Sequence, residues 1–266
     1  MNPVRRFAAA LREMRWSHVV IELALLITGI LIALAVDGWI DGRRDERLER
    51  QYLELLSRDL ERDLKVLEET LVFEEAQVAA SALAYRALRS GAVPPEEREA
   101  VAAALGQLTA RRTLRLGRAT YTDLLSTGNL RLIRNADLRD RIVRLYEANE
   151  RAQLIRDRNN QEFVDRMYMT YLLDQGLVAP RPDRNLPTLA KPDADFAKRV
   201  GLATDARLDR IWQLPPDAPE LSVLSGRVWY RGRSSSGAID QSQQIIAEIG
   251  TVQHAIATEL STRRWP

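Results

Sequence analysis

The chain has 266 residues, among them 39 Lys and Arg, 37 Asp and Glu, and no cysteine. The missing cysteine excludes disulfides, thiol catalysis and cysteine-ligated metal sites. Four arginines and three acidic residues fall within the first 40 positions, so the remainder is close to neutral. A near-neutral remainder argues against a basic face that captures nucleic acid, and we expect no nucleic-acid partner.

An apolar segment near the N-terminus is the most informative feature. Val19–Val36 is eighteen residues long with one ionisable group, Glu22, and a tryptophan lies just outside each end. Trp16 and Trp39 are 23 positions apart, which is about 34 Å along a helix and fits a hydrocarbon core of about 30 Å. We predict a transmembrane helix over residues 18–40, with both indoles as membrane-interface anchors and membrane lipid as partner. A cleaved signal peptide and a buried core helix are the less favoured alternatives.

The side of the membrane occupied by each end is less clearly indicated. Four arginines lie in the predicted basic tail, residues 1–17, and four more follow the span at similar distance, so the positive-inside count is a tie. The free amine adds to the tail, and a large domain can be translocated whatever its charge. We expect a cytoplasmic tail and an extracytoplasmic domain, residues 41–266, at the inner membrane. Residues 1–15 form either a basic amphipathic stretch on the membrane or a disordered tail.

Small and polar residues gather on one side of the predicted span. Glu22, Gly29, Ala33 and Asp37 fall on this side. Gly29 and Ala33 form a small-xxx-small pair, which lets two helix backbones approach closely. The pattern favours a helix–helix contact in a homo-oligomer or with a membrane protein partner. The alternative is that the Glu22 carboxylate reaches the headgroup region.

Residues 41–90 predict a long amphipathic helix that continues the span. Apolar residues recur at steps of three and four and form one stripe: Leu53, Leu56, Leu60, Leu64, Leu67, Leu71 and Val78. Because the stripe also includes Glu74 and later small residues, packing within a bundle is favoured over a coiled coil.

Further helix signals follow. Gly91 suits the left-handed residue that closes the long helix, and Pro94-Pro95 with acidic neighbours opens the next one. A short helix is expected over 119–127. Asn135 can then cap a long helix over 136–175.

Residues 176–219 differ in composition because they hold seven of the eleven prolines. We expect a proline-rich insert there, with short helices at most, near 194–201 and 204–213. The chain then returns as a helix over 220–263, with an interruption expected at 231–237. With no strand alternation, the predicted class is all-α: one N-terminal transmembrane helix continuing into a long amphipathic helix that packs in an antiparallel helical bundle.

Two blocks of sequence resemble a known family. The first joins Glu22–Trp39, which contains GILIAL, to LERQYLELLSRDLERDL at 48–64; the second is LLSTGNLRLIRNADLRDRIVRLYE at 124–147. In this order and spacing they resemble a bacterial family of single-span, membrane-anchored helical proteins of unassigned function. The chain departs from the family at 35–38, where Ala-Val-Asp-Gly replaces a more amide-rich run, and in the insert. The resemblance implies an anchor plus a helical domain and supplies no catalytic residues.

The second block contains a candidate binding turn. Ser126, Gly128 and Asn129 are interpreted first as a turn that fixes the angle between two helices. A binding role is the alternative, and it depends on two flanking arginines, Arg131 and Arg134.

Other polar patterns favour structure over chemistry. Asp59 and Asp63 are interleaved with arginines, which predicts a solvated face. His254 is interpreted as a satisfied structural histidine, and Arg231–Gly237 as a kink or short loop in preference to an anion site. The aromatic group around Tyr168 is typical of a core. We predict no catalytic residue, no cofactor and no metal site.

Three functions remain open from the sequence. The first is a non-enzymatic, membrane-anchored helical protein that mediates protein–protein interaction or scaffolds an envelope assembly. The second is an extracytoplasmic sensor or small-ligand module that signals through a membrane partner, since a tail of about 17 residues is too short for an output domain. The third is a hydrolase with a dispersed site.

Overall fold

The protein is all-α over the residues that its computed structural model describes: 16–91, 93–177, 208–263 and 265, with side chains from Val20 onward. The helices in chain order are α2 (Trp16–Ser90), η1 (Pro95–Glu97), α3 (Arg98–Gln107), α4 (Ala119–Ser126), η2 (Asn129–Leu132), α5 (Ala136–Asn159), η3 (Asn160–Met169), α6 (Thr170–Asp174), α8 (Asp209–Trp212) and α9 (Pro219–Thr262). These ranges contain no strand, which confirms the predicted class. The tail, residues 1–15, and most of the proline-rich insert, 178–207, lie outside the described residues, as does the short helix expected near 194–201.

The chain divides into two compact units, one made of Met1–Tyr52 with Arg263–Pro266 and the other of Leu53–Thr262. In the first unit, α2 is long and apolar enough to cross a membrane, with a mean hydropathy of 2.4 in its most apolar window. Every residue from Val20 to Asp41 is exposed. Near the end of this unit, Arg263 donates to Glu49 at 2.8 Å, and its guanidinium lies over the ring of Trp265.

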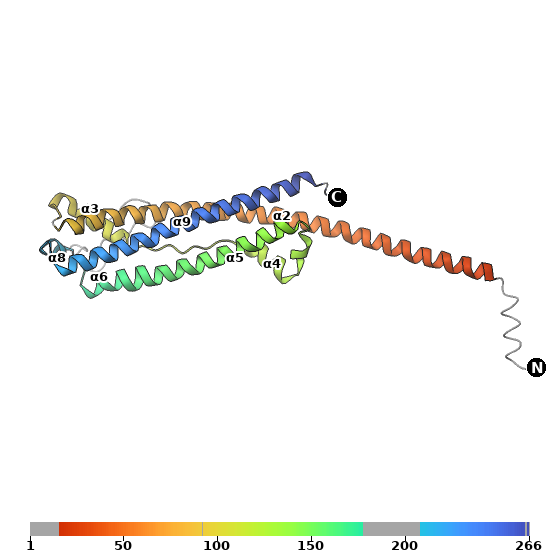
Figure 1. Ribbon diagram of the computed structural model, residues 1–266, viewed down its shortest axis with the longest axis horizontal. Helices are drawn as coiled ribbons and strands as arrows, with labels where there is room; N and C mark the ends of the chain where they lie inside the picture. Colours follow the sequence, from red (N-terminus) through yellow and green to blue (C-terminus); the bar gives the residue numbers. More distant parts are fainter. Residues whose placement is uncertain (1–15, 92, 178–207, 264, 266) are drawn as a thin grey trace, which may run out of the picture. The chain divides into compact units, whose positions relative to one another are not determined.

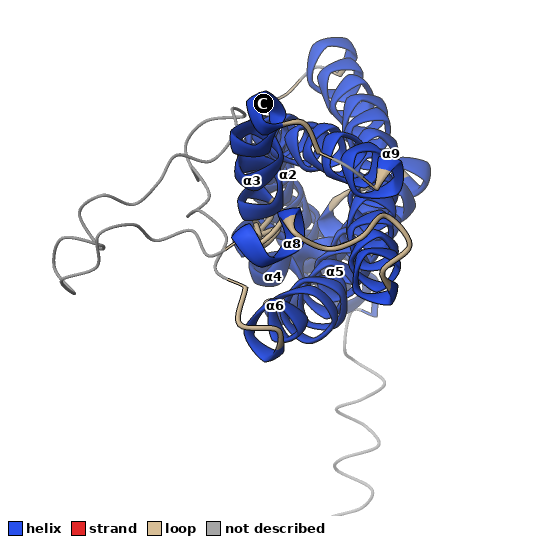
Figure 2. Ribbon diagram, turned by 90° about the vertical axis from the view of Figure 1, so that its left-hand side faces the viewer, coloured by secondary structure: helices blue, strands red, loops and turns tan. Residues whose placement is uncertain are grey.

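The second unit is the helical bundle. Contacts join Glu74 of α2 to Arg156 of α5, and Arg156 in turn to Ala238 and Ser242 of α9. Further along α2, Ser81 donates to the carbonyl of Val228, earlier in α9. α9 therefore runs antiparallel to α2, and Figure 1 shows it antiparallel to α5 as well. Figure 2 views the bundle from the end that carries α3, α6 and α8.

The apolar stripe of α2 accounts for part of the core. Leu53, Leu56, Leu60 and Leu67 are at most 1% exposed, as predicted, whereas three other members of the stripe, Leu64, Leu71 and Val78, are only half-buried. Polar side chains share the buried side of α2 with these leucines. A second apolar cluster, centred on Leu105, Tyr168 and Leu224, joins α3, η3 and α9.

The predicted helix ends agree well with the structure. Gly91 has a φ of +74°, and a Cβ built on it would lie 2.8 Å from Cα of Pro216. Position 91 therefore needs glycine for conformation and for space. Asn135 caps α5, since its Oδ1 accepts the N–H of Leu138 at 3.1 Å. The helix predicted over 136–175 is present, although its central part, η3, has wider π-type turns.

The interruption expected at 231–237 is wrong, because α9 is continuous there. Two tertiary contacts explain the continuity. Arg231 is buried and donates to the carbonyls of Leu108 and Ala110. Gly232 lets α2 approach closely, since a Cβ at this position would lie 2.6 Å from Cβ of Ser81. The glycine and serine content that suggested a loop instead permits tight helix packing.

Candidate functional site

A row of buried polar side chains runs along α2 inside the bundle. Its members are at most 6% exposed and are spaced as on one side of a helix: Asp63, Thr70, Glu74, Gln77 and Ser81. α5 contributes Asn149 and Arg156 to the same interior, and α9 contributes Arg231. Buried charges need partners, so the pairing of each group separates structural from functional candidates.

In the middle of the row, the charges are fully paired. Glu74 and Arg156 form an ion pair whose side chains are 4% and 3% exposed. Arg156 also donates to the carbonyl of Ala238 at 3.3 Å and to the Ser242 hydroxyl at 3.4 Å. We call Glu74, Arg156 and Ser242 the ion-pair centre. None of their side-chain polar atoms is buried without a partner, so this centre holds α2, α5 and α9 together.

Arg231 makes a second paired site. Its guanidinium donates to Leu108, to Ala110 at 3.0 Å and to Ser235. Burial lowers the pKa of Arg231, and the charge of Glu74 opposes that shift. The arginine therefore ties α9 to the segment that follows α3, and its role is structural, with no free edge for an anion.

The Asp63 end of the row differs. A small pocket near this end is lined by Gly117, Arg118, Tyr121, Tyr146, Asn149, Glu150 and Gln153; Asp63 does not line it but accepts a hydrogen bond from the backbone of Gly117. We call this set the Asp63 pocket. Asp63 Oδ1 accepts the N–H of Gly117 at 2.6 Å. Its Oδ2, the Tyr146 hydroxyl and both polar atoms of the Asn149 amide are buried without a hydrogen-bond partner among the described residues.

Burial also shifts the ionisation of this pocket. It raises the pKa of Asp63 to about 6, with the Gly117 hydrogen bond opposing the shift and the nearby charge of Asp59 adding to it. Burial likewise raises the pKa of Tyr146, and the charges of Asp63 and Asp59 raise it further. A carboxyl group with a pKa near neutrality in a partly enclosed site is a functional candidate on physical grounds.

The wall and the mouth of the pocket are well defined. The rings of Tyr121 and Tyr146 stack with centroids 4.3 Å apart and an interplanar angle of 1°. At the mouth, Arg118 and Glu150 form an exposed ion pair at 3.4 Å. The free volume inside is about 10 Å³, which holds about one water molecule.

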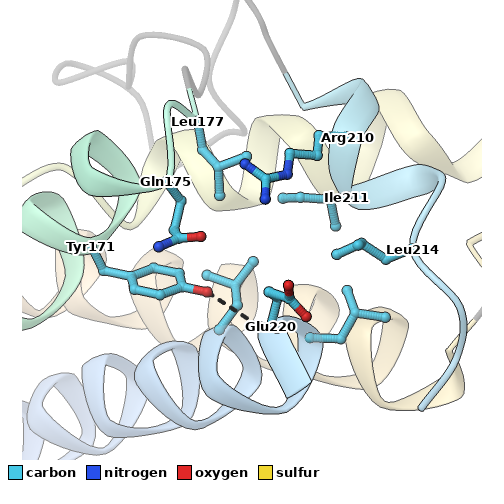
Figure 3. A pocket seen from close by; sticks show the side chains of 9 residues that line it. Tyr171, Gln175, Leu177, Arg210, Ile211, Leu214 and Glu220 are labelled. Atoms are coloured by element: carbon cyan, nitrogen blue, oxygen red, sulfur yellow. Dashed lines mark hydrogen bonds between the residues drawn. The ribbon is translucent and has the colours of Figure 1, made fainter. Parts of the chain in front are cut away.

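A second cavity lies at the other end of the bundle (Figure 3). Tyr171, Gln175, Arg210 and Glu220 surround it together with apolar residues, and its free volume is also about 10 Å³. The Tyr171 hydroxyl donates to the backbone carbonyl of Glu220 at 3.2 Å, and Arg227 lies over the Tyr171 ring. Its apolar floor and this backbone contact indicate a packing joint between α6, α8 and α9.

A wider groove separates α5 from α9. Arg141, Arg144, Leu145, Ala148, Glu248, Thr251 and Val252 line its free volume of about 330 Å³. Both arginines and the glutamate are exposed, and the structure aims no buried polar group into the groove. It is roomy enough for a small molecule but chemically less specific than the Asp63 pocket.

The predicted binding turn lies apart from this chemistry. Gly128 has a φ of +70°, as a glycine turn requires, and Ser126 donates to the carbonyl of Asp123. Ser126, Arg131 and Arg134 are exposed and Asn129 is half-buried. None of these five residues lines the Asp63 pocket. The turn connects α4 to η2, and a binding role for it stays a prediction.

The predicted residues of the span are all on the surface of α2. Glu22, Gly29, Ala33 and Asp37 are exposed, and a Cβ on Gly29 would meet nothing within 4 Å. Trp39 is 59% exposed, with the Arg43 guanidinium 4.2 Å from its ring centroid. Trp16 begins α2, and its side chain lies outside the described residues. Helix pairing and interface anchoring by these residues stay predictions.

The interpretation of Asp59 and Asp63 as a solvated face is wrong. Asp63 is 2% exposed, and the side chain of Asp59 is 13% exposed and accepts a hydrogen bond from Thr120. Asp63 lies between two buried leucines and begins the polar row. Its spacing from Glu74 and Gln77, which places all three on one side of α2, is the sequence feature that could have predicted its burial. His254 is exposed on α9, and its interpretation as a satisfied structural histidine stays a prediction, whereas Tyr168 is fully buried, as the core interpretation expected.

The fold and this site define an all-α protein built on a helical bundle with a partly unpaired polar interior. The chain belongs to a family of unknown function, DUF6090, whose family model matches residues 22–169, more than half of the sequence. The matched region contains most of the apolar part of α2, the ion-pair residues Glu74 and Arg156, and all the residues that line the Asp63 pocket. No curated protein and no solved structure matches the chain.

Proposed function

We propose that this chain is a membrane-anchored, non-enzymatic helical protein that mediates protein–protein interaction or scaffolding at a bacterial envelope. One observation carries the proposal: between Val20 and Ile40, thirteen large apolar side chains of α2 are 48–69% exposed. Soluble monomers rarely expose contiguous apolar patches of more than a few hundred Å². Lipid is the solvent that such a helix requires, and its backbone hydrogen bonds are already satisfied internally.

Fractionation of cells that express the full-length chain tests the anchor. The protein is expected in the membrane pellet and to resist extraction by alkaline carbonate. A double change, Leu26→Arg and Ile30→Arg, should release it, because two charges at the centre of a span are costly. Leu173→Arg is the matched control, since Leu173 is 72% exposed in the bundle. Wild-type protein in the supernatant without detergent would refute the anchor.

The orientation proposal places the N-terminus in the cytoplasm and the bundle outside the membrane. It rests on the arginines that precede the span and on the ability of large domains to be translocated whatever their charge. A C-terminal reporter that is active only outside the cytoplasm should be active. Activity of a cytoplasmic reporter at the same position would reverse the orientation.

Interaction with a protein partner is supported by exposed aromatic side chains on α9. Trp229 and Tyr230 are 43% and 52% exposed and pack edge to face, 4.9 Å apart. Aromatic residues of this kind are enriched at interaction hot spots. Copurification from membranes in mild detergent should retain a stoichiometric partner, and Trp229→Ala with Tyr230→Ala should lose it. Retention by the double variant would remove this surface from the proposal.

The alternative is a sensor or small-ligand module that acts through a membrane partner. The Asp63 pocket favours it, because buried and unpaired polar groups there surround a small free volume. A small molecule retained through purification would favour this alternative over the interaction role.

A further inference from the structure

The groove between α5 and α9 has charged walls whose charges do not pair with each other. Arg141 and Arg144 line it from α5, and Glu248 lines it from α9. None of the three forms an ion pair with another described residue. Asp137 and Asp140 precede the two arginines by one helical turn, in the order that favours pairing, and do not pair with them either. Two guanidinium groups and a carboxylate are therefore available to a ligand in the groove.

The register of the two helices explains why these charges stay apart. Asn135 of α5 donates to Glu259 of α9 at 3.0 Å, and the ion-pair centre joins the same two helices further along α5. Because the helices are antiparallel, these two contacts place Glu248 across from Ala148. The carboxylate thus lies beyond the arginines along the groove and not opposite them.

The groove consequently has a positive end and a negative end. Ala148 follows Arg144 by four residues and Arg141 by seven, which is about 6 and 10 Å along the helix axis. Side chains on a helix lean toward its own N-terminus, so the arginines lean toward one end of the groove and Glu248 toward the other. We take the separation of the two charged ends as about 8 Å.

The middle of the groove is mostly apolar. Leu145, Ala148 and Val252 line it between the charged ends. The Thr251 hydroxyl donates to the carbonyl of Ala247 in its own helix, so its oxygen can accept a further hydrogen bond but not donate one. The free volume of about 330 Å³ is within the range of small-molecule sites.

These features select the chemistry of the occupant. Two guanidinium groups one helical turn apart suit a carboxylate, which accepts paired N–H donors. Glu248 suits an ammonium group and repels a second anionic group at its end. We infer that the groove binds an elongated zwitterion, with its carboxylate on Arg141 and Arg144, its ammonium group on Glu248 and an apolar body between them.

The separation of the ends limits which zwitterions fit. An α-amino acid carries both charges on one carbon, less than about 4 Å apart, and does not reach both ends. A peptide of two or three residues does, at about 3.5 Å for each residue, and so does an ω-amino acid. The ligand class is therefore a short peptide or an ω-amino carboxylate.

This inference rests on the small-ligand alternative and deepens it, and every residue involved lies within Leu53–Thr262. The test uses full-length protein in mild non-ionic detergent at pH 7.5, with binding followed by saturation-transfer NMR titration. The probes are 6-aminohexanoate and trialanine. Two analogues each remove one charge: N-acetyl-6-aminohexanoate has no ammonium group and 6-aminohexanamide has no carboxylate. Alanine keeps both charges but holds them close together.

The expected result is saturable binding of 6-aminohexanoate, about tenfold or more tighter than that of either analogue or of alanine. Binding of trialanine identifies peptide termini as the ligand, and binding of 6-aminohexanoate alone identifies an ω-amino acid. Equal binding of alanine or of either analogue would overturn the inference, as would no saturable binding of either probe. Such a failure would leave the anchor untouched, because fractionation tests it on α2 alone.

Variants locate the two contacts. Glu248→Gln should lower 6-aminohexanoate binding to the level of the N-acetyl analogue and leave the binding of that analogue unchanged. Arg141→Gln with Arg144→Gln should lower it to the level of 6-aminohexanamide. Arg86→Gln with Arg89→Gln is the matched control, because these arginines have the same spacing and are exposed on α2 outside the groove. The control should bind as wild type does, and wild-type affinity in Glu248→Gln would refute the site.

Discussion

The ion-pair centre and the surroundings of the Asp63 pocket both include residues of α2 and α5, yet their polar groups differ in how they are paired. In the centre, the Arg156 guanidinium meets Glu74 and Ser242, and nothing is left unpaired. At the pocket, the lining residues Tyr146 and Asn149 have buried polar atoms without a partner, and so does Asp63 next to it. A buried charge that is paired can have a purely structural role. A buried charge without a partner destabilises the folded state, so its presence calls for an explanation other than folding. The comparison thus separates a structural site from a functional candidate.

The largest expected effect comes from breaking the ion-pair centre. Arg156→Met should lower the free energy of unfolding by about 3–5 kcal/mol, because it leaves the Glu74 carboxylate buried and uncompensated. Urea denaturation of the full-length protein in detergent, followed by helical ellipticity, measures the loss. The double variant Glu74→Leu, Arg156→Met should recover most of it. A single variant as stable as wild type would mean that the pair does not support the fold.

Removing the charge of Asp63 is expected to raise the free energy of unfolding above about pH 6, whereas removing the charge of Arg156 lowers it. The folded-state pKa of about 6 exceeds the ordinary value of 3.8, so the folded protein holds this proton more tightly than the unfolded chain. The resulting stability is complete below about pH 4 and is lost as pH rises through 6, up to about 3 kcal/mol. Asp63→Asn removes this dependence and should be the more stable protein at pH 8.

Unfolding free energies of wild type and Asp63→Asn, measured at pH 5 and pH 8, check this sign. Asp59 and Glu150 also face this region, with Arg118 opposite Glu150, so the difference between the two proteins isolates the Asp63 contribution. Parallel pH profiles would show that Asp63 is not a buried, perturbed carboxyl group.

Close packing between α2 and α9 should give an intermediate effect. Gly232→Ala would place its Cβ 2.6 Å from Cβ of Ser81, and overpacking of this kind costs about 1–3 kcal/mol. Gly237→Ala in the same helix meets nothing within 4 Å and should stabilise α9 by about 0.5–1 kcal/mol. Thermal midpoints of the two variants should therefore move in opposite directions. Equal shifts would contradict the close approach of the two helices.

The smallest effect is expected at the mouth of the pocket. Arg118 and Glu150 are more than half exposed, and exposed ion pairs contribute less than about 1 kcal/mol. Arg118→Gln should therefore leave the denaturation midpoint almost unchanged. A large loss of stability would show that the mouth belongs to the structural framework, like Arg156.

Much of the fold could be predicted from local sequence. The ends of α2 and α5 follow from Gly91 and Asn135, whose effects act within one helical turn. The apolar segment of α2 and the leucine stripe follow from periodicity alone. The continuity of α9 could not be predicted from the sequence. Glycines and serines such as those near Arg231 are typical both of loops and of close helix packing, and only the position of α2 shows which of the two applies.

The sequence by itself determined the helical class, the apolar segment and the helix ends, because those depend on neighbours a few positions away. Only the tertiary structure decided which charges are buried. Asp63 is an acidic residue with arginines on either side in the sequence, and Glu74 is an acidic residue within the apolar stripe of the same helix; their spacing hints at a shared side of α2 but does not show which groups pair with them. Their burial and pairing depend on Gly117, Tyr146 and Arg156, which lie more than fifty positions away and meet them only when the bundle closes.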